Sequence, residues 1–281
     1  NPSASKKSKK EMSDKIFATT TLHDEVSHAV VLGRLIAIRR IVPENAKIGA
    51  PTLVFLHEGL GCIGMWKDYP GLLAAAAGCP ALVYDRFGHG DSSSEDKDRD
   101  LSFFDAEAHR VLPALHSACG LSDVILIGHS DGGTIALLHA GRTPVRGVIT
   151  EAAHVFVEPE SLAGVKAAKQ AWLDEGFRSR LKRYHGDQTA DMFGAWSKMW
   201  SASWFRNWNI EPSLIEITCP LLAIQGADDE YGTEAQIQAI VNGVRGPVDD
   251  MIVPACGHAP HLEARKVVLE RMTSFIRSLT Y

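Results

Sequence analysis

The chain has 281 residues, of which 45% are hydrophobic and 22% are charged, as expected for a globular protein with one large α/β domain or two small ones. Its 29 lysines and arginines against 34 aspartates and glutamates give a net charge of −5, which argues against a nucleic-acid partner. The five cysteines are odd in number and lack C-x-x-C pairing, which favours reduced thiols in a cytoplasmic protein over a disulfide framework.

Residues 1–14 are polar and basic, and no apolar segment follows them. We therefore expect a disordered basic tail rather than a secretory signal. No apolar stretch approaches the roughly 18 residues that a membrane-spanning helix needs, so neither a membrane span nor a membrane partner is expected.

Two strand patterns follow one another along the chain. Residues 15–42 alternate and are rich in β-branched side chains, which predicts an antiparallel hairpin or meander at the edge of a sheet. From Thr52 the strands become short apolar runs separated by helical stretches, the pattern of a parallel sheet covered on both faces. These predicted strands are Leu53–Leu56, Ala81–Tyr84, Val124–Ile127, Val145–Ile149, Leu221–Ile224 and Asp250–Val253.

Helices are predicted between most of these strands: Trp66–Gly78, Phe103–Cys119 with a kink at Pro113, Glu234–Val244 and His261–Leu279. About seventy residues separate the strands near Thr150 and Pro220, and they contain five of the six tryptophans. A connection of that length needs structure of its own, so we expect a helical lid with helices at Glu160–Tyr184 and Asp187–Ser203. Several of its tryptophans are expected to line a pocket.

The segment Gly128–Gly132 reads G-x-S-x-G between a predicted buried strand and a predicted helix. A serine on such a turn projects its hydroxyl at the top of the sheet, and the helix N-terminus beneath it favours a developing anion. Ser130 is therefore the candidate nucleophile. It needs a base, and the base needs an orienting carboxylate.

The loops after the last two predicted strands supply both groups. The first loop contains Asp228 and Asp229, and the second contains His258. Because catalytic groups in parallel sheets lie at the carboxyl ends of strands, these loops are expected to meet Ser130. Glu151, at the end of another predicted strand, is a further candidate acid.

These motifs together resemble the α/β-hydrolase superfamily from about residue 15 to the C-terminus. The resemblance rests on the elbow, on Asp85–Ser92 (D-x-x-G-x-G-x-S), on Gly226-x-x-Asp229 and on Gly257-His258. It implies an α/β-hydrolase fold with a mostly parallel sheet of about eight strands, helices on both faces and an inserted helical cap. The implied division is a core at 15–151 and 213–281 with a cap at 152–212, and the G-x-x-D spacing favours Asp229 as the acid.

The resemblance also implies an oxyanion hole made by the backbone amides of Asp131 and Gly59, with Leu60 as the alternative to Gly59. Where relatives usually read His-Gly-x, this chain reads His57-Glu58-Gly59. A carboxylate that pointed inward would oppose an oxyanion, so Glu58 is expected to point away and hold backbone, or to bind a donor on the substrate.

The sequence thus predicts a cofactor-independent serine hydrolase acting on a carboxylic ester with an apolar or aromatic part. Leu60, His154, Trp196 and Trp200 are candidate substrate contacts. No metal site is expected, because His258-x-x-His261 lacks further ligands. The expected partners are a small-molecule substrate and a second copy of the chain. Carbon–carbon bond hydrolysis of a diketone, lactone, thioester or amide hydrolysis, cofactor-free oxygenation and a non-catalytic receptor stay open as alternatives.

Overall fold

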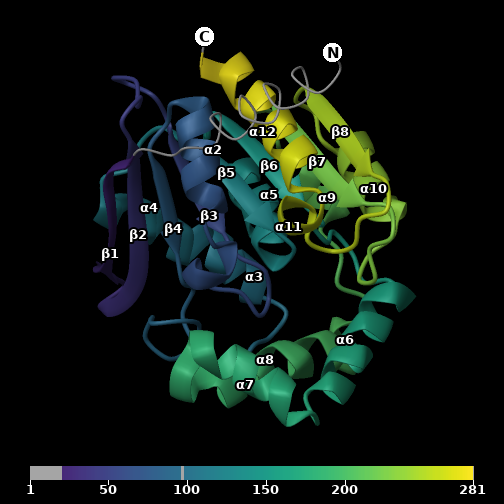
Figure 1. Ribbon diagram of the computed structural model, residues 1–281. Coiled ribbons are helices and arrows are strands. Elements are labelled where there is room, and N and C mark those ends of the chain that lie inside the picture. Colours follow the sequence, from purple (N-terminus) through teal and green to yellow (C-terminus); the bar gives the residue numbers. More distant parts are fainter. Residues whose placement is uncertain (1–20, 96–97, 281) are drawn as a thin grey trace, which may run out of the picture.

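The computed structural model describes residues 21–95 and 98–280. An eight-stranded sheet runs through its centre in the order β1-β2-β4-β3-β5-β6-β7-β8 (Figure 1). The strands are β1 (Thr21–Val31), β2 (Arg34–Pro43), β3 (Thr52–Leu56), β4 (Ala81–Tyr84), β5 (Val124–His129), β6 (Gly147–Glu151), β7 (Leu221–Gly226) and β8 (Val248–Val253). β1 pairs antiparallel with β2, and β2 pairs antiparallel with β4, whereas all other neighbouring strands pair parallel, which confirms a mostly parallel sheet with an antiparallel edge. The part of the predicted hairpin at 15–20 lies outside the described residues.

Two predicted strands start elsewhere in the structure. The first, predicted from Val145, begins at Gly147, and just before it the amide of Arg146 donates a hydrogen bond to the carbonyl of Val124. The second, predicted from Asp250, begins at Val248, whose partner is Leu221 on β7. Two of its six residues, Asp249 and Asp250, are charged and exposed, so its sequence lacks the continuous apolar run that marks the central strands.

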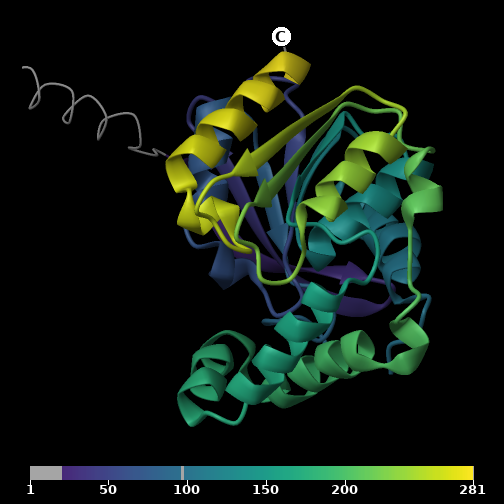
Figure 2. The same cartoon turned by 90° about the vertical axis from the view of Figure 1, so that its right-hand side faces the viewer.

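Helices cover both faces of the sheet (Figures 1 and 2). On one face, α2 (Tyr69–Ala77) and α12 (Arg265–Thr280) enclose a core that includes Phe55 and Ile127. On the other, α4 (Leu112–Cys119), α5 (Asp131–Arg142), α9 (Glu211–Leu214) and α10 (Glu234–Gly243) enclose a core that includes Val54 and Leu126. Neighbouring strand residues thus point to opposite faces, and both faces are buried.

Three of the helices predicted against the sheet are divided in the structure. The segment predicted at Trp66–Gly78 is a 3-10 turn, Ile63–Trp66, followed after Lys67 (φ 55°) by α2. The segment 103–119 contains α3 (Phe103–Ala106), a π-helical turn and α4. Pro113 lies in the first turn of α4 and has no N–H to donate. The irregularity predicted at Pro113 is instead a π-helical turn directly before α4. The last helix splits at Ala264 into α11 (Pro260–Glu263) and α12.

A helical segment connects β6 to β7 and lies beyond the carboxyl ends of the strands (Figure 2). It comprises α6 (Pro159–Ala171), α7 (Glu175–His185) and α8 (Thr189–Ser201), with α9 at its end. The helix predicted at Glu160–Tyr184 is therefore two helices. The break follows Ala171, where Asp174 caps α7 by accepting a hydrogen bond from the amide of Phe177. Within the described ranges, no helix has the length and hydropathy to cross a membrane.

Candidate active site

Ser130 occupies a sharp turn between β5 and α5. Its backbone has φ 53° and ψ −117°, a conformation that L-residues rarely adopt. The glycines on either side permit this turn: a Cβ at Gly128 would collide with the carbonyl of Gly132, and one at Gly132 would collide with the carbonyl of Leu56. The serine is held at the top of β5, directly before the N-terminus of α5.

His258 pairs with Asp229. Its Nδ1 lies 2.8 and 2.9 Å from the two carboxylate oxygens, and the Asp229 side chain also accepts hydrogen bonds from Gln225 Nε2 and the amide of Tyr231. The other candidate acids are placed differently. Asp228 is exposed, and Glu151 lies 2.9 Å from Nδ1 of a second histidine, His261.

This pairing sets the protonation of both groups. Burial would lower the pKa of His258, but the hydrogen bond and charge of Asp229, with smaller effects from Glu58 and Glu230, raise it above its usual value. Burial would raise the pKa of Asp229, yet the hydrogen bond and charge of His258 lower it. An ionised Asp229 beside Nδ1 is the arrangement that would orient the imidazole and favour Nε2 as a candidate base.

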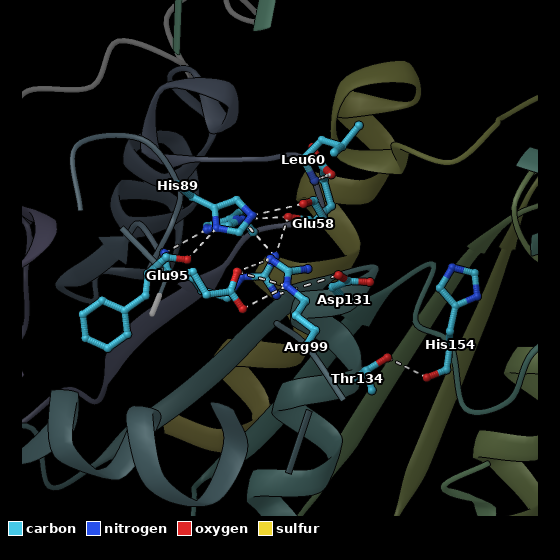
Figure 3. Close-up of polar contacts among 12 residues, drawn as sticks. Glu58, Leu60, His89, Glu95, Arg99, Asp131, Thr134 and His154 are labelled. Atoms are coloured by element: carbon cyan, nitrogen blue, oxygen red, sulfur yellow. Dashed lines mark hydrogen bonds and ion pairs between the residues drawn. The ribbon is translucent and has the colours of Figure 1, made fainter. Parts of the chain in front are cut away.

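The predicted oxyanion donors lie in two segments that touch. Asp131 begins α5, and its Oδ2 is 3.1 Å from the position that a Cβ on Gly59 would occupy. Such a Cβ would also lie 2.5 Å from Cδ1 of Trp196 on α8, so the loop requires glycine there. The alternative donor, the amide of Leu60, already donates to Glu58 Oε2 at 2.5 Å (Figure 3). The amides of Gly59 and Asp131 remain as candidates for the oxyanion hole.

Glu58 holds backbone, as expected, but it also contributes to the cavity wall beside the candidate triad. Burial raises the pKa of its carboxyl group. The backbone carbonyl of Glu58 accepts hydrogen bonds from His57 Nδ1 (2.7 Å) and from Nη2 of the buried Arg86 (2.9 Å). His57 Nε2 in turn accepts a hydrogen bond from the amide of Arg86 at 3.0 Å. Buried polar contacts thus fix the loop that carries Gly59.

A cavity of about 320 Å³ lies between the sheet and the α6–α8 segment. Ser130 and His258 line it together with all four candidate substrate contacts, Leu60, His154, Trp196 and Trp200. The other tryptophans of the segment do not line it: Trp172 stacks on Phe193 with ring centroids 4.2 Å apart, Trp208 stacks on Phe205 at 5.1 Å, and Trp204 is exposed.

His154 is buried in the cavity wall, 5.8 Å from the ring of His258 and 5.1 Å from that of Trp200. Burial and the charge of His258 lower its pKa to about 3, so it is a neutral imidazole at neutral pH. Its carbonyl accepts a hydrogen bond from Thr134 Oγ1 (Figure 3). A neutral ring here offers a hydrogen-bonding group to a substrate without adding charge.

Several residues of the site were not singled out from the sequence. Tyr231 packs its ring 4.6 Å from that of His258, and Gln225 braces Asp229. Gln225 lies at the end of β7 and Tyr231 in the loop that follows it, and this closeness to Asp229 in the sequence is the signal that could have identified both. The pair of Glu151 and His261 joins β6 to α11, and no spacing rule links residues so far apart in sequence.

His261 also lines the cavity, and its ring lies 5.1 Å from that of His129. The ring of His129 in turn lies 5.2 Å from that of His258. The H-x-x-H spacing thus places its two histidines beside different carboxylates, Asp229 and Glu151. No group of three metal-ligating side chains with suitable geometry occurs in the described part of the chain.

Comparison with known proteins gives relatives of two kinds. The chain is 31% identical over 152 residues to a 2-succinyl-6-hydroxy-2,4-cyclohexadiene-1-carboxylate synthase from Enterobacter, a match that spans about half of each protein, 53% in both cases. A protein of the same name from Serratia proteamaculans is 25% identical over 270 residues, covering 84% of this chain and 96% of that one. Among solved structures, the proline iminopeptidase of Mycobacterium smegmatis superposes with a TM-score of 0.71 at 20% identity, over 91% of this chain and 98% of that one.

A family model matches most of the chain. The sequence profile of the alpha/beta hydrolase family matches residues 53–271, from β3 to α12, a range that includes Ser130, Asp229 and His258. Together with the eight-stranded sheet and its two helical layers, this match confirms the resemblance inferred from the motifs. The chain belongs to the alpha/beta hydrolase family.

Proposed function

We propose that this protein is a cofactor-independent serine hydrolase that cleaves a carboxylic ester with an apolar or aromatic part. The observation that supports this most is the shared cavity. A serine on a strained turn and a histidine paired with a buried carboxylate line the same pocket, whose remaining wall is largely apolar and aromatic.

In the proposed reaction, Ser130 Oγ attacks the ester carbonyl while His258 Nε2 takes the hydroxyl proton. The amides of Gly59 and Asp131 stabilise the oxyanion of the tetrahedral intermediate. His258 then gives the proton to the departing alcohol, leaving an acyl-enzyme on Ser130. Water attacks the acyl carbonyl with His258 again as base, and the carboxylic acid leaves as Ser130 recovers its proton.

The relatives named as synthases supply the second candidate, since the same triad could act as a base on a carboxylate-bearing substrate. One observation weighs against a close copy of that activity. The name of those relatives denotes a product with a succinyl and a carboxylate group, whereas the described residues that line this cavity include no lysine or arginine. Carboxylate recognition ordinarily uses such cations.

Steady-state hydrolysis of p-nitrophenyl esters with short, long and aromatic acyl groups tests the proposal. The wild type should turn over at least one class repeatedly, and Ser130→Ala and His258→Ala should each lose about a thousandfold or more in kcat. Circular dichroism and thermal unfolding check that both variants fold. Rates equal to those of Ser130→Ala across the panel would contradict ester hydrolysis, and diketones and lactones would be tested next.

A further inference from the structure

The charges around the cavity are of one sign. The charged side chains in its lining are Glu58, Asp131, Glu230 and Glu263, and the described lining residues include no lysine or arginine. A cavity with these carboxylates and no lysine or arginine in its wall disfavours an anionic ligand and favours a cationic one. The four carboxylates differ, however, in how far the protein itself compensates them.

Two of the four are engaged by protein groups. Asp131 is buried, and burial raises the pKa of its carboxyl group, but the charge of the buried Arg86, whose Nη1 lies 3.9 Å from Oδ2, partly offsets this effect. Glu263 is exposed, and its two oxygens accept the amides of Gly257 and Ala259 at 2.7 and 3.0 Å. Glu230 is exposed to solvent, which screens its charge. Glu58 is therefore the carboxylate on which a ligand group would have the largest effect.

The carboxylate of Glu58 has spare hydrogen-bonding capacity. It receives one hydrogen bond among the described residues, from the amide of Leu60 to Oε2 (Figure 3). An ionised carboxylate has about four acceptor sites, and burial raises the pKa of this one because the protein compensates its charge incompletely. The charge of Glu58 also raises the pKa of His258, so the two groups are electrostatically coupled across the cavity.

The rest of the wall suits a cation with an apolar body. Trp66, Trp196 and Trp200 line the cavity, and the faces of indole rings attract ammonium groups. Val165 and Leu181, from α6 and α7, add aliphatic surface. A protonated amine with alkyl substituents would contact both kinds of surface and donate its N–H to a carboxylate.

We infer that the substrate of this hydrolase carries a protonated amine, and that Glu58 binds this amine in the cavity beside Ser130 and His258. The inference rests on the proposed ester hydrolysis and names the substrate class for it. Glu58 is in this view a specificity residue that touches the substrate.

The test uses matched esters that differ in one atom. p-Nitrophenyl dimethylaminobutanoate, protonated at neutral pH, is compared with its carbon isostere, in which a C–H replaces the N–H. A second pair places the amine in the alcohol, as dimethylaminoethyl benzoate and its isostere. In at least one pair, the wild type should prefer the amine by about tenfold or more in kcat/KM, the effect of one charge-assisted hydrogen bond.

The Glu58→Gln variant should reduce this preference to about threefold or less while keeping an oxygen to accept the amide of Leu60. Glu160→Gln is the matched control: it removes one negative charge at an exposed position of α6 that does not line the cavity, and it should keep the preference. No preference for the amine in either pair, or an equal preference in Glu58→Gln, would overturn the inference.

Failure of the inference and failure of the proposed function are distinguishable. Hydrolysis of the neutral isosteres that depends on Ser130 supports the proposed function whatever the amine preference. If no ester is turned over, binding of the same pairs to Ser130→Ala, measured by quenching of tryptophan fluorescence, still decides the inference. Tighter binding of the amine that Glu58→Gln abolishes supports it, and equal binding of both members overturns it.

Discussion

Replacement of Ser130 by glycine should abolish activity and at the same time make the protein more stable. Ser130 has φ 53° and ψ −117°, and a non-glycine residue held in so sparsely populated a region costs roughly 1–3 kcal/mol. Glycine removes that strain but adds about 0.4–1 kcal/mol of backbone entropy to the unfolded chain. The difference predicts that Ser130→Gly is about 1 kcal/mol more stable than Ser130→Ala, which keeps the Cβ and the strain.

Both variants lack the hydroxyl, so the comparison isolates the backbone. The assay is equilibrium unfolding in urea for the wild type and both variants, with thermal unfolding as a second measure, in which about 1 kcal/mol corresponds to roughly 2 °C for a protein of this size. Both variants should be inactive. An alanine variant as stable as the glycine variant would show that the backbone at Ser130 is not strained, which would refute the prediction.

Three further predictions concern the residues around Ser130. Asp229→Asn should lower kcat by about 10³–10⁴-fold. Because Asp229 raises the pKa of His258, the acid limb of the pH–kcat/KM profile should also move to lower pH in this variant. An unmoved acid limb would refute the pairing of Asp229 with His258. The raised pKa of His258 also contributes stability, which is fully present below the pKa of histidine in the unfolded chain and is lost as the pH rises through its pKa in the folded protein. The difference in unfolding free energy between wild type and Asp229→Asn should therefore shrink from about pH 6 to about pH 9. Gly59→Ala should lower kcat by about tenfold to a thousandfold through its clash with Trp196, and the loss should be smaller in a Trp196→Ala background; equal losses would exclude the clash as the cause.

The sequence was most informative where local patterns are strong. Buried strands such as β3, β4 and β5 appear as continuous apolar runs, and their predicted positions agree with the structure to within two residues. Edge strand β8 and the divided helices were less predictable. Their boundaries depend on contacts such as the side-chain cap of Asp174, which no periodicity reveals.

For the site, order along the chain was the useful signal. A serine after β5, an acid after β7 and a histidine after β8 must converge once the sheet is parallel. The sequence could not show which carboxylate pairs with which histidine, because Glu151 also ends a strand and His261 lies three residues after His258. Only the fold shows that Asp229 pairs with His258 and Glu151 with His261.

The histidines show why composition alone could not assign the base. Five buried imidazoles surround the site with their pKa values lowered by burial: His57, His89, His129, His154 and His185. Each is neutral at neutral pH and, with one donor and one acceptor, serves as a hydrogen-bonding bridge. His185, for example, accepts the amide of Gly90 and contacts the carbonyl of Leu60, and so joins α7 to the loop that carries Gly59. His258 is buried as well, but the adjacent carboxylate of Asp229 reverses the direction of its pKa shift. The adjacent carboxylate therefore distinguishes the candidate base, since burial acts on all six rings alike.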